Sequence, residues 1–385
     1  MSWESLPKAI TSFSVPQFFS PSVLGAAVHC RLKTATASSR AAMDRLAAGP
    51  EAAIGILCHR VLERCGKEFG AEPRQIFDQE YARACDELRV DPRRAHYFDL
   101  ASTRPRAQWL QLRGWILKRA SSARPISIPP TGITSRRVNS LGGSEIGLQS
   151  VSLRLRGAAD RVRKVDGNTV EIRDYKTGEI FEYDGSLKPA IVTQLYAYGL
   201  MAMESSGVTD VRLIVDDGDE HELPFTRDIQ AEARERLTAI VEQLPEAGLQ
   251  QAMDLASPGS DCFGCAIRHT CAAYLNVAPS WWKSYPASVD RLPHDTWGEL
   301  VDIHQGSSNT VLLKDEAGRR VRIDGVDKRH ELQSESVGKK FYFFNLQATG
   351  SCRDFGGRRF HPSSFHEHAR DSSERRAWSA QVFWS

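Results

Sequence analysis

The sequence contains no apolar run of about 18 residues or more, and this absence argues against a membrane-spanning helix. Its first residues lack the basic start and apolar stretch of a secretory signal, so we expect the chain to stay in the cytoplasm. No G-x-x-x-x-G-K-[ST] motif occurs anywhere in the sequence. Any ATP-driven motor that works with this protein is therefore expected on another chain.

Net charge is also small, because 50 Lys and Arg face 48 Asp and Glu, for a balance of +2. A phosphate-binding surface would therefore be a local groove and not a property of the whole chain. With 385 residues, 41% of them hydrophobic, the chain is long enough for two or three globular domains. In a reducing cytoplasm its 8 cysteines are better explained as core residues or metal ligands than as disulfides.

Hydrophobic periodicity divides the chain into a helical part, a mixed part and a strand-rich part. Residues 21–120 have mainly helical periodicity, and a loop rich in Ser, Pro, Gly and Arg follows at 121–140. The elements predicted for the mixed part are strands at 152–163 and 169–177, a helix at 189–204, a hairpin at 211–225 and a helix at 228–244.

The turn sequence D-G-N at 166–168 predicts a β-hairpin, because Asp-Gly between strand-like runs favours a tight turn. If the hairpin is symmetric about its glycine, Asp160 lies opposite Asp174 and Val162 lies opposite Ile172. Directly opposed residues have Cβ atoms about 4.5–5.5 Å apart and share one face of the sheet. The hairpin is therefore predicted to bring two carboxylates together.

Lys176 falls on the same face as the two aspartates, two residues beyond Asp174. Opposed carboxylates repel each other, and a divalent cation between them would remove that repulsion. Two carboxylates, a hard cation and a lysine together suit hydrolysis of a phosphodiester bond. The alternative is an ordinary surface hairpin whose D-x-K is solvated.

Three segments resemble the core motifs of RecB-family PD-(D/E)XK nucleases: GAADRV at 157–162, IRDYKTG at 172–178 and QLYAYG at 194–199. The resemblance implies a restriction-endonuclease-like α/β core in which Asp160 and Asp174 bind Mg²⁺ or Mn²⁺ and Lys176 is catalytic. It also implies that Gln194 and Tyr198 line the site; as an i, i+4 pair they share one helix face. Without the resemblance, a core tyrosine beside a solvent-facing glutamine would explain them equally well.

The same family carries a histidine ligand on an early helix, and GILCHRVLE at 55–63 is similar to that segment. The resemblance therefore implies that His59 is a further metal ligand. Glu145, at the start of the strand before the first core motif, is a weaker candidate for supporting the site. Arg163 and Arg173 are expected on a solvated strand face.

Three closely spaced cysteines, Cys262, Cys265 and Cys271, form C-x2-C-x5-C, which indicates a metal or cluster site. The layout resembles the iron–sulfur branch of the family, such as the AddB nuclease domain and the CRISPR-adaptation nucleases. In that branch an S-P-S-x-L segment leads to one N-terminal cysteine, and this implies Cys30 as the fourth ligand of a [4Fe-4S] cluster. Arg31 departs from the proline that often follows.

Zinc is the alternative to the cluster, with His29 or His269 as a substitute ligand. Buried cysteines without any ligand are a third interpretation, which the spacing of the three cysteines disfavours. The resemblance extends over residues 20–275, so the cysteines would join the first and last parts of one domain.

The strand-rich remainder predicts a small β-barrel, OB-like, at 293–385. The predicted domains are a nuclease domain at 1–277, a linker at 278–292 and this barrel. Aromatic residues at 341–344 lie among basic residues, a mixture that suits stacking on single-stranded bases unless the aromatics fill the barrel core. The aromatic residues are Phe341, Tyr342, Phe343 and Phe344, and the basic residues are Lys339, Lys340, Arg353, Arg358 and Arg359.

The leading functional hypothesis is a metal-dependent deoxyribonuclease that acts on DNA ends or single strands. The second is a non-catalytic DNA-binding or scaffold subunit with the same fold. The third is a processing subunit in repair, CRISPR-like adaptation or anti-phage defence, with a helicase or a defence-complex protein as its partner and no membrane.

Overall fold

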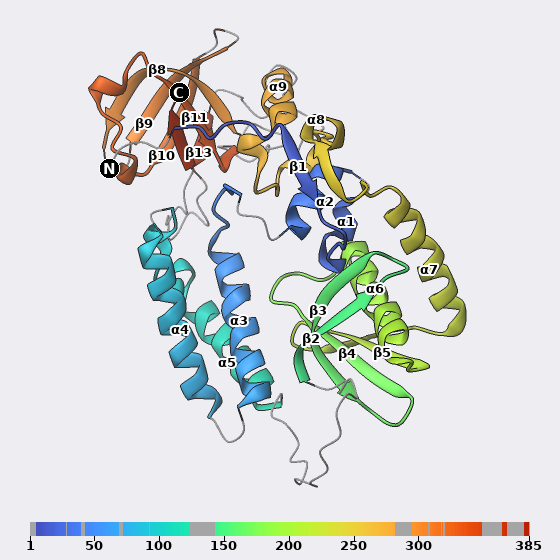
Figure 1. Cartoon of the computed structure of the whole chain (residues 1–385). Coiled ribbons are helices and arrows are strands. Elements are labelled where there is room, and N and C mark those ends of the chain that lie inside the picture. Colours follow the sequence, from blue (N-terminus) through green and yellow to red (C-terminus); the bar gives the residue numbers. More distant parts are fainter. Residues whose placement is uncertain are drawn as a thin grey trace.

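The computed structural model describes residues 5–27, 29–39, 43–68, 72–91, 93–122, 143–281, 295–306, 309–316, 318, 320–348, 364–367 and 381–384. In these ranges the chain forms a helical unit, a five-stranded sheet with its own helices, a segment that contains three cysteines, and a second sheet (Figure 1). None of the described helices combines the length and the apolar character that crossing a bilayer requires.

The helical unit confirms the helical periodicity of the first 120 residues. It consists of α3 (Pro50–Lys67), α4 (Pro73–Val90) and α5 (Arg106–Ser122), with the short turns η2 (Ala95–Tyr97) and η3 (Leu100–Thr103) between the last two. Both α3 and α4 begin with proline in the first turn, where a missing N–H costs nothing. Arg64 and Lys67 stand in the last turn of α3 and complement its dipole.

A five-stranded sheet with the order β2-β3-β4-β5-β6 forms the centre of the mixed part. Its strands are β2 (Gly143–Ser150), β3 (Leu155–Lys164), β4 (Thr169–Tyr175), β5 (Asp210–Asp216) and β6 (Glu220–Leu223). Strands β4 and β5 are parallel, and α6 (Pro189–Ser206) connects them. Val162 pairs with Ile172, so the register predicted for the hairpin is confirmed.

Helices α6 and α7 (Arg227–Glu242) lie on one side of the sheet, and the helical unit lies on the other (Figure 1). Apolar side chains of β3, β4, β5 and α6 form one continuous core. The helical unit has a separate core, and among the side chains that the structure describes, Tyr175 is the only one from the sheet in its buried cluster. Tyr175 stands between Asp174 and Lys176, so it packs into the helical unit while its two neighbours face the other way.

The N-terminal segment and the cysteine segment lie side by side. Strand β1 (Ser12–Val15) pairs with β7 (Gly248–Gln251), far along the chain. The short elements between and after them are η1 (Pro21–Val23), α1 (Leu24–Ala27), α2 (Arg31–Ser38), α8 (Ala252–Leu255), η4 (Ser260–Cys262), η5 (Arg268–Thr270) and α9 (Ala272–Trp281). Helix α9 continues to Trp281, so the first residues of the predicted linker are helical.

The C-terminal residues form a seven-stranded sheet in the order β12-β13-β10-β9-β8-β11-β14. Its elements are β8 (Thr296–Gln305), β9 (Asn309–Asp315), β10 (Arg320–Val326), η6 (Lys328–His330), η7 (Ser334–Ser336), β11 (Lys340–Phe344), β12 (Leu346–Ala348), β13 (Ser364–Glu367) and β14 (Gln381–Trp384). Among the described residues, no pairing joins the edge strands β12 and β14. A closed OB-like barrel therefore stays a prediction.

The aromatic residues of β11 do not form an open stacking surface. Phe341, Phe343 and Phe344 are fully buried, and Tyr342 stacks on Trp297. Lys340 lies over the ring of Tyr342. The expectation that these residues mix with basic side chains to stack on bases is therefore wrong for the three phenylalanines, because they fill the core. Arg353, Arg358 and Arg359 lie outside the described residues.

A buried polar network fixes the C-terminal sheet to the cysteine segment. Arg268 donates from Nε to Asp295 at 2.5 Å and from Nη2 to Asn345 at 2.6 Å. The hydroxyl of Tyr274, on α9, donates to the same Asp295 at 2.6 Å. Trp297 packs in one apolar cluster with Cys262 and Tyr274. The C-terminal sheet is thus a docked neighbour of the cysteines.

Candidate metal centre and cysteine pocket

The end of the β3–β4 hairpin places the two predicted carboxylates next to each other in the register. Asp160 Oδ2 accepts a hydrogen bond from the backbone N–H of Tyr175 at 2.7 Å. Asp160 Oδ1 lies 3.4 Å from Nδ1 of His59, which comes from α3 in the helical unit. The early histidine and the hairpin are therefore brought together although about 100 residues separate them in the sequence.

Gln194 bridges the other carboxylate and the lysine. Its Nε2 donates to Asp174 Oδ1 at 3.1 Å, and its Oε1 accepts from Lys176 Nζ at 3.1 Å. Lys176 Nζ also lies 2.8 Å from Asp174 Oδ2. The three side chains form a closed polar ring that uses both ends of the amide. The interpretation of Gln194 as a solvent-facing residue is not supported by these contacts.

Asp174 is almost completely buried, and this burial raises the pKa of its carboxyl group to about 6. Lys176 opposes the shift and Asp160 adds to it. Burial disfavours the charged form of a carboxylate, and a nearby cation restores it. The site is therefore one in which positive charge beside Asp174 is favourable.

Tyr198, on α6, supports strand β3 of the hairpin. Its hydroxyl donates to the backbone oxygen of Ala158 at 2.7 Å, two residues before Asp160. A Cβ added at Gly157 would lie 2.8 Å from Pro21 and 3.3 Å from Tyr198, so only glycine fits under this tyrosine. The tyrosine thus holds the strand that carries the first carboxylate. The packing of Tyr198 and Pro21 therefore explains why the GAADRV motif begins with a glycine at position 157.

Glu145 and the two strand arginines have different positions from one another. Glu145 lies in β2, where Ser144 pairs with Arg161 and Ile146 pairs with Ala159. Its register position is therefore opposite Asp160. Arg163 is partly exposed and pairs with Glu171 at 2.7 Å. Arg173 is 13% exposed and pairs with buried acids, so its expected place on a solvated face is wrong. Two buried acids on that face draw the guanidinium inward.

In the part of the chain that the structure describes, no three His, Cys, Asp or Glu side chains stand ready to hold a metal ion. In the hairpin site, His59 and Lys176 engage the carboxylate oxygens that a cation would use. The donor set itself fits a hard divalent cation, because it offers two carboxylates and an imidazole at the edge of a buried surface.

A model of the PD-(D/E)XK nuclease superfamily matches residues 19–272. The chain belongs to this superfamily. No curated protein matches the chain. Members of the superfamily are typically metal-dependent nucleases and generally use Mg²⁺ or Mn²⁺. The matched range contains the hairpin, the helix with Gln194, and all of the cysteines predicted to act as ligands.

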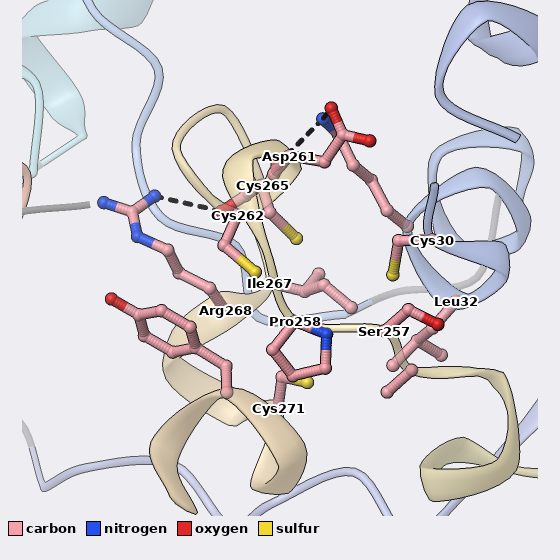
Figure 2. A pocket seen from close by; sticks show the side chains of 13 residues that line it. Cys30, Leu32, Ser257, Pro258, Asp261, Cys262, Cys265, Ile267, Arg268 and Cys271 are labelled. Carbon is pink, nitrogen blue, oxygen red and sulfur yellow. Dashed lines mark hydrogen bonds and ion pairs between the residues drawn. The ribbon is translucent and has the colours of Figure 1, made fainter. Parts of the chain in front are cut away.

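The four predicted cysteine ligands of this superfamily member line one pocket. Cys30 comes from the turn before α2, and Cys262, Cys265 and Cys271 come from the short turns around η4 and η5. Figure 2 shows their sulfur atoms turned toward the pocket, with Ile267 and Pro258 among them. Neither His29 nor His269 is among the lining residues. The four cysteines therefore share one pocket, whose lining includes neither histidine, although their sulfur atoms are not close enough together to form a ready metal site.

Burial disfavours the thiolate forms of Cys262, Cys265 and Cys271. Burial is the main cause that raises the pKa of Cys262 to about 12, and charges on the other three cysteines contribute to the rise. Burial also raises the pKa values of Cys265 and Cys271. The side chain of Lys33 lines the pocket, where a positive charge favours thiolates. Soft sulfur donors in an apolar pocket with a neighbouring cation fit an iron–sulfur cluster or zinc.

Proposed function

We propose that this chain is a Mg²⁺- or Mn²⁺-dependent deoxyribonuclease that hydrolyses phosphodiester bonds. The observation that carries the proposal is the closed ring of Asp174, Lys176 and Gln194 beside the Asp160–His59 contact. This arrangement puts an acid beside an imidazole and a second acid beside an ammonium on paired strands of one hairpin, in a chain of the nuclease superfamily.

Asp160, Asp174 and His59 would hold the metal ion. When bound, the ion would activate a water molecule and offset the charge of the phosphate. Nζ of Lys176 lies 2.8 Å from Asp174 and can donate a hydrogen bond to the attacking water or to the phosphate. Gln194 orients both Asp174 and Lys176 through its amide, and Tyr198 fixes the strand before Asp160.

We also propose that Cys30, Cys262, Cys265 and Cys271 hold a [4Fe-4S] cluster that clasps the first and last parts of the nuclease domain. The shared pocket and its four sulfur donors support this assignment. The purified protein is expected to be brown, with an absorption shoulder near about 400 nm. Anaerobic purification that yields zinc and no iron would replace the cluster with a zinc site.

DNA ends or single strands are the proposed substrates, in repair, CRISPR-like adaptation or anti-phage defence. A helicase or a defence-complex protein is the proposed partner. The division into a nuclease domain at 1–277, a linker at 278–292 and an OB-like barrel at 293–385 also stays a proposal. The buried aromatics of β11 give no support for single-strand stacking, so the barrel is not assigned a role in DNA binding.

The test is a cleavage assay on end-labelled single-stranded DNA, double-stranded DNA and RNA, with the full chain and Mg²⁺ or Mn²⁺. Lys176→Ala, purified in parallel, reports any contaminating nuclease. Metal-dependent cleavage of DNA by the wild type and its loss in Lys176→Ala would support the proposal. DNA binding without cleavage, in a protein that binds Mn²⁺, would favour the non-catalytic scaffold instead.

A further inference from the structure

The candidate metal centre is assembled from two units with separate cores. Asp160, Asp174 and Lys176 belong to the sheet, whereas His59 belongs to α3 in the helical unit. The 3.4 Å contact between His59 and Asp160 therefore depends on how the helical unit sits on the sheet. Whatever joins the two units also sets the geometry of the site.

Asp216, at the C-terminal end of β5, joins both units. It is fully buried, and its Oδ1 accepts from Nε of Arg119, on α5 of the helical unit, at 2.6 Å. Its Oδ2 accepts from Nη1 of Arg173 at 2.9 Å. Its backbone oxygen accepts from the backbone N–H of Lys176 at 2.9 Å. Asp216 thus contacts the helical unit and also Arg173 and Lys176, the residues on either side of Asp174 and Tyr175.

Arg119, Trp115 and the turn at Gly218 pack together around Asp216 and form one corner of the interface between the two units. Its Nη2 donates to the backbone oxygen of Gly218, and its guanidinium lies 5.8 Å from the ring of Trp115. Gly218 has φ of +134°, and a Cβ there would lie 3.1 Å from Trp115 Nε1. The turn after β5 is therefore shaped to receive this arginine. Lysine could not make the same two contacts, because its ammonium lacks the planar fork of the guanidinium.

The effect of this corner reaches the helix that carries His59. Helix α5 packs against α3, and Tyr175 fills the helical core beside them. The Arg119–Asp216 contact on α5 therefore also bears on where α3 lies against the sheet.

We propose that Arg119 and Asp216 are positioning residues that fix His59 against Asp160 and so set the metal affinity of the site. Neither residue contacts the metal ligands through its own side chain in the contacts described above. The inference rests on the proposed function of the hairpin as a metal centre. It adds a determinant that lies on the opposite face of the sheet.

The test is a Mn²⁺ titration of the full chain, followed by electron paramagnetic resonance of free Mn²⁺ and by DNA cleavage. Arg119→Lys is expected to raise the Mn²⁺ concentration for half-saturation about tenfold in both readouts, which corresponds to about 1.4 kcal/mol. The cleavage rate at saturating Mn²⁺ should stay within about threefold of wild type, because the chemical groups are intact. Arg212→Lys is the matched control, because Arg212 is exposed on β5, the strand that carries Asp216, and pairs with Glu222.

A double-mutant cycle separates positioning from general loss of stability. If Arg119 acts through His59, Arg119→Lys should add less than about twofold to the metal requirement of His59→Ala. Additive effects of the two substitutions, or an unchanged metal requirement in a folded Arg119→Lys protein, would overturn the inference. If Arg119→Lys does not fold, Asp216→Asn replaces it with the same expected and overturning results.

The two proposals fail in different ways. A wild-type protein that binds no Mn²⁺ and cleaves no DNA would overturn the proposed function, and this inference with it. A wild type that binds Mn²⁺ and cleaves DNA, with the same half-saturation in Arg119→Lys, would overturn only the positioning role.

Discussion

The carboxylate site and the cysteine pocket differ in what holds their side chains in place. Asp160 and Asp174 lie on paired strands. Asp160 accepts a hydrogen bond from the backbone N–H of Tyr175 and faces His59. Asp174 accepts a hydrogen bond from Gln194 and faces Lys176. The cysteines come from short turns, where Cys262 and Cys265 are buried thiols without disulfides. Their pocket is shaped mainly by apolar neighbours such as Ile267 and Pro258.

This difference teaches which site depends on its ligand. The carboxylate site has protein partners for its charges, so the hairpin should keep its shape when the metal is removed. The cysteine segment has little regular structure of its own, and a bound cluster would provide its folding energy. Loss of the metal ion from the carboxylate site should therefore lower activity before stability, and loss of the cluster from the cysteine pocket should lower stability first.

The largest effect is expected at the carboxylates. Asp160→Ala should lower the cleavage rate by at least about 10³-fold, because the metal loses a ligand and the phosphate charge is no longer offset. The melting temperature should stay near that of wild type. Asp166→Ala is the matched control, since Asp166 is exposed in the turn of the same hairpin. A folded Asp160→Ala protein with wild-type cleavage would remove Asp160 from the metal centre.

A large effect on stability is expected at the cysteines. Cys262→Ser should lose the absorption near about 400 nm and fall several-fold in soluble yield, because the clasp joins distant parts of one domain. Cys65→Ser is the control, since Cys65 is equally buried but lies in the core of the helical unit. It should keep its iron. Equal iron content in the two variants, measured by metal analysis, would refute the assignment of the clasp.

A moderate effect is expected at His59. His59→Ala should raise the Mn²⁺ concentration for half-maximal cleavage roughly tenfold, about 1.4 kcal/mol of metal binding, because the two carboxylates remain. His221→Ala is the control, since His221 lies on β6, which β5 separates from the hairpin, and contacts Asp217 at 3.0 Å. An unchanged metal requirement in His59→Ala would make His59 a structural residue.

The smallest effect is a pH dependence of stability in chelator. Asp174 has a folded pKa of about 6, above the usual aspartate value of 3.8, mainly because it is buried. The folded protein therefore binds this proton more tightly than the unfolded chain does. Its free energy of unfolding should gain about 1 kcal/mol between about pH 8 and pH 5, relative to Asp174→Asn. Denaturant titrations of both proteins would measure it, and parallel pH profiles would contradict the pKa shift.

The sequence predicts the register of the carboxylate hairpin because its two strands are adjacent in the chain. The D-G turn and the period of 2 fix the register of Val162 and Ile172, and this register sets Asp160 beside Asp174. Gln194 and Tyr198 share a helix face, yet their different roles are not visible in the spacing. Gln194 bridges the charged groups, whereas Tyr198 donates to the backbone of Ala158.

The positions that sequence reasoning missed depend on contacts between distant segments. Arg119 and Asp216 are 97 residues apart, and each resembles an ordinary surface charge in its own segment. Arg173 was expected in solvent, because alternation shows only which face a residue takes and not what covers that face. The phenylalanines of β11 were open to two interpretations for the same reason. Their burial depends on strands that pair far along the chain.

The central claim is that the hairpin carboxylates hold the ion that hydrolyses DNA. The most direct test adds Mn²⁺ stepwise to wild type and to Asp174→Ala, and measures bound Mn²⁺ and cleavage of labelled DNA in the same samples. In the wild type, bound Mn²⁺ and the cleavage rate should rise together, and in Asp174→Ala both should be absent over that range. Cleavage by a folded Asp174→Ala protein at the wild-type rate would contradict the claim.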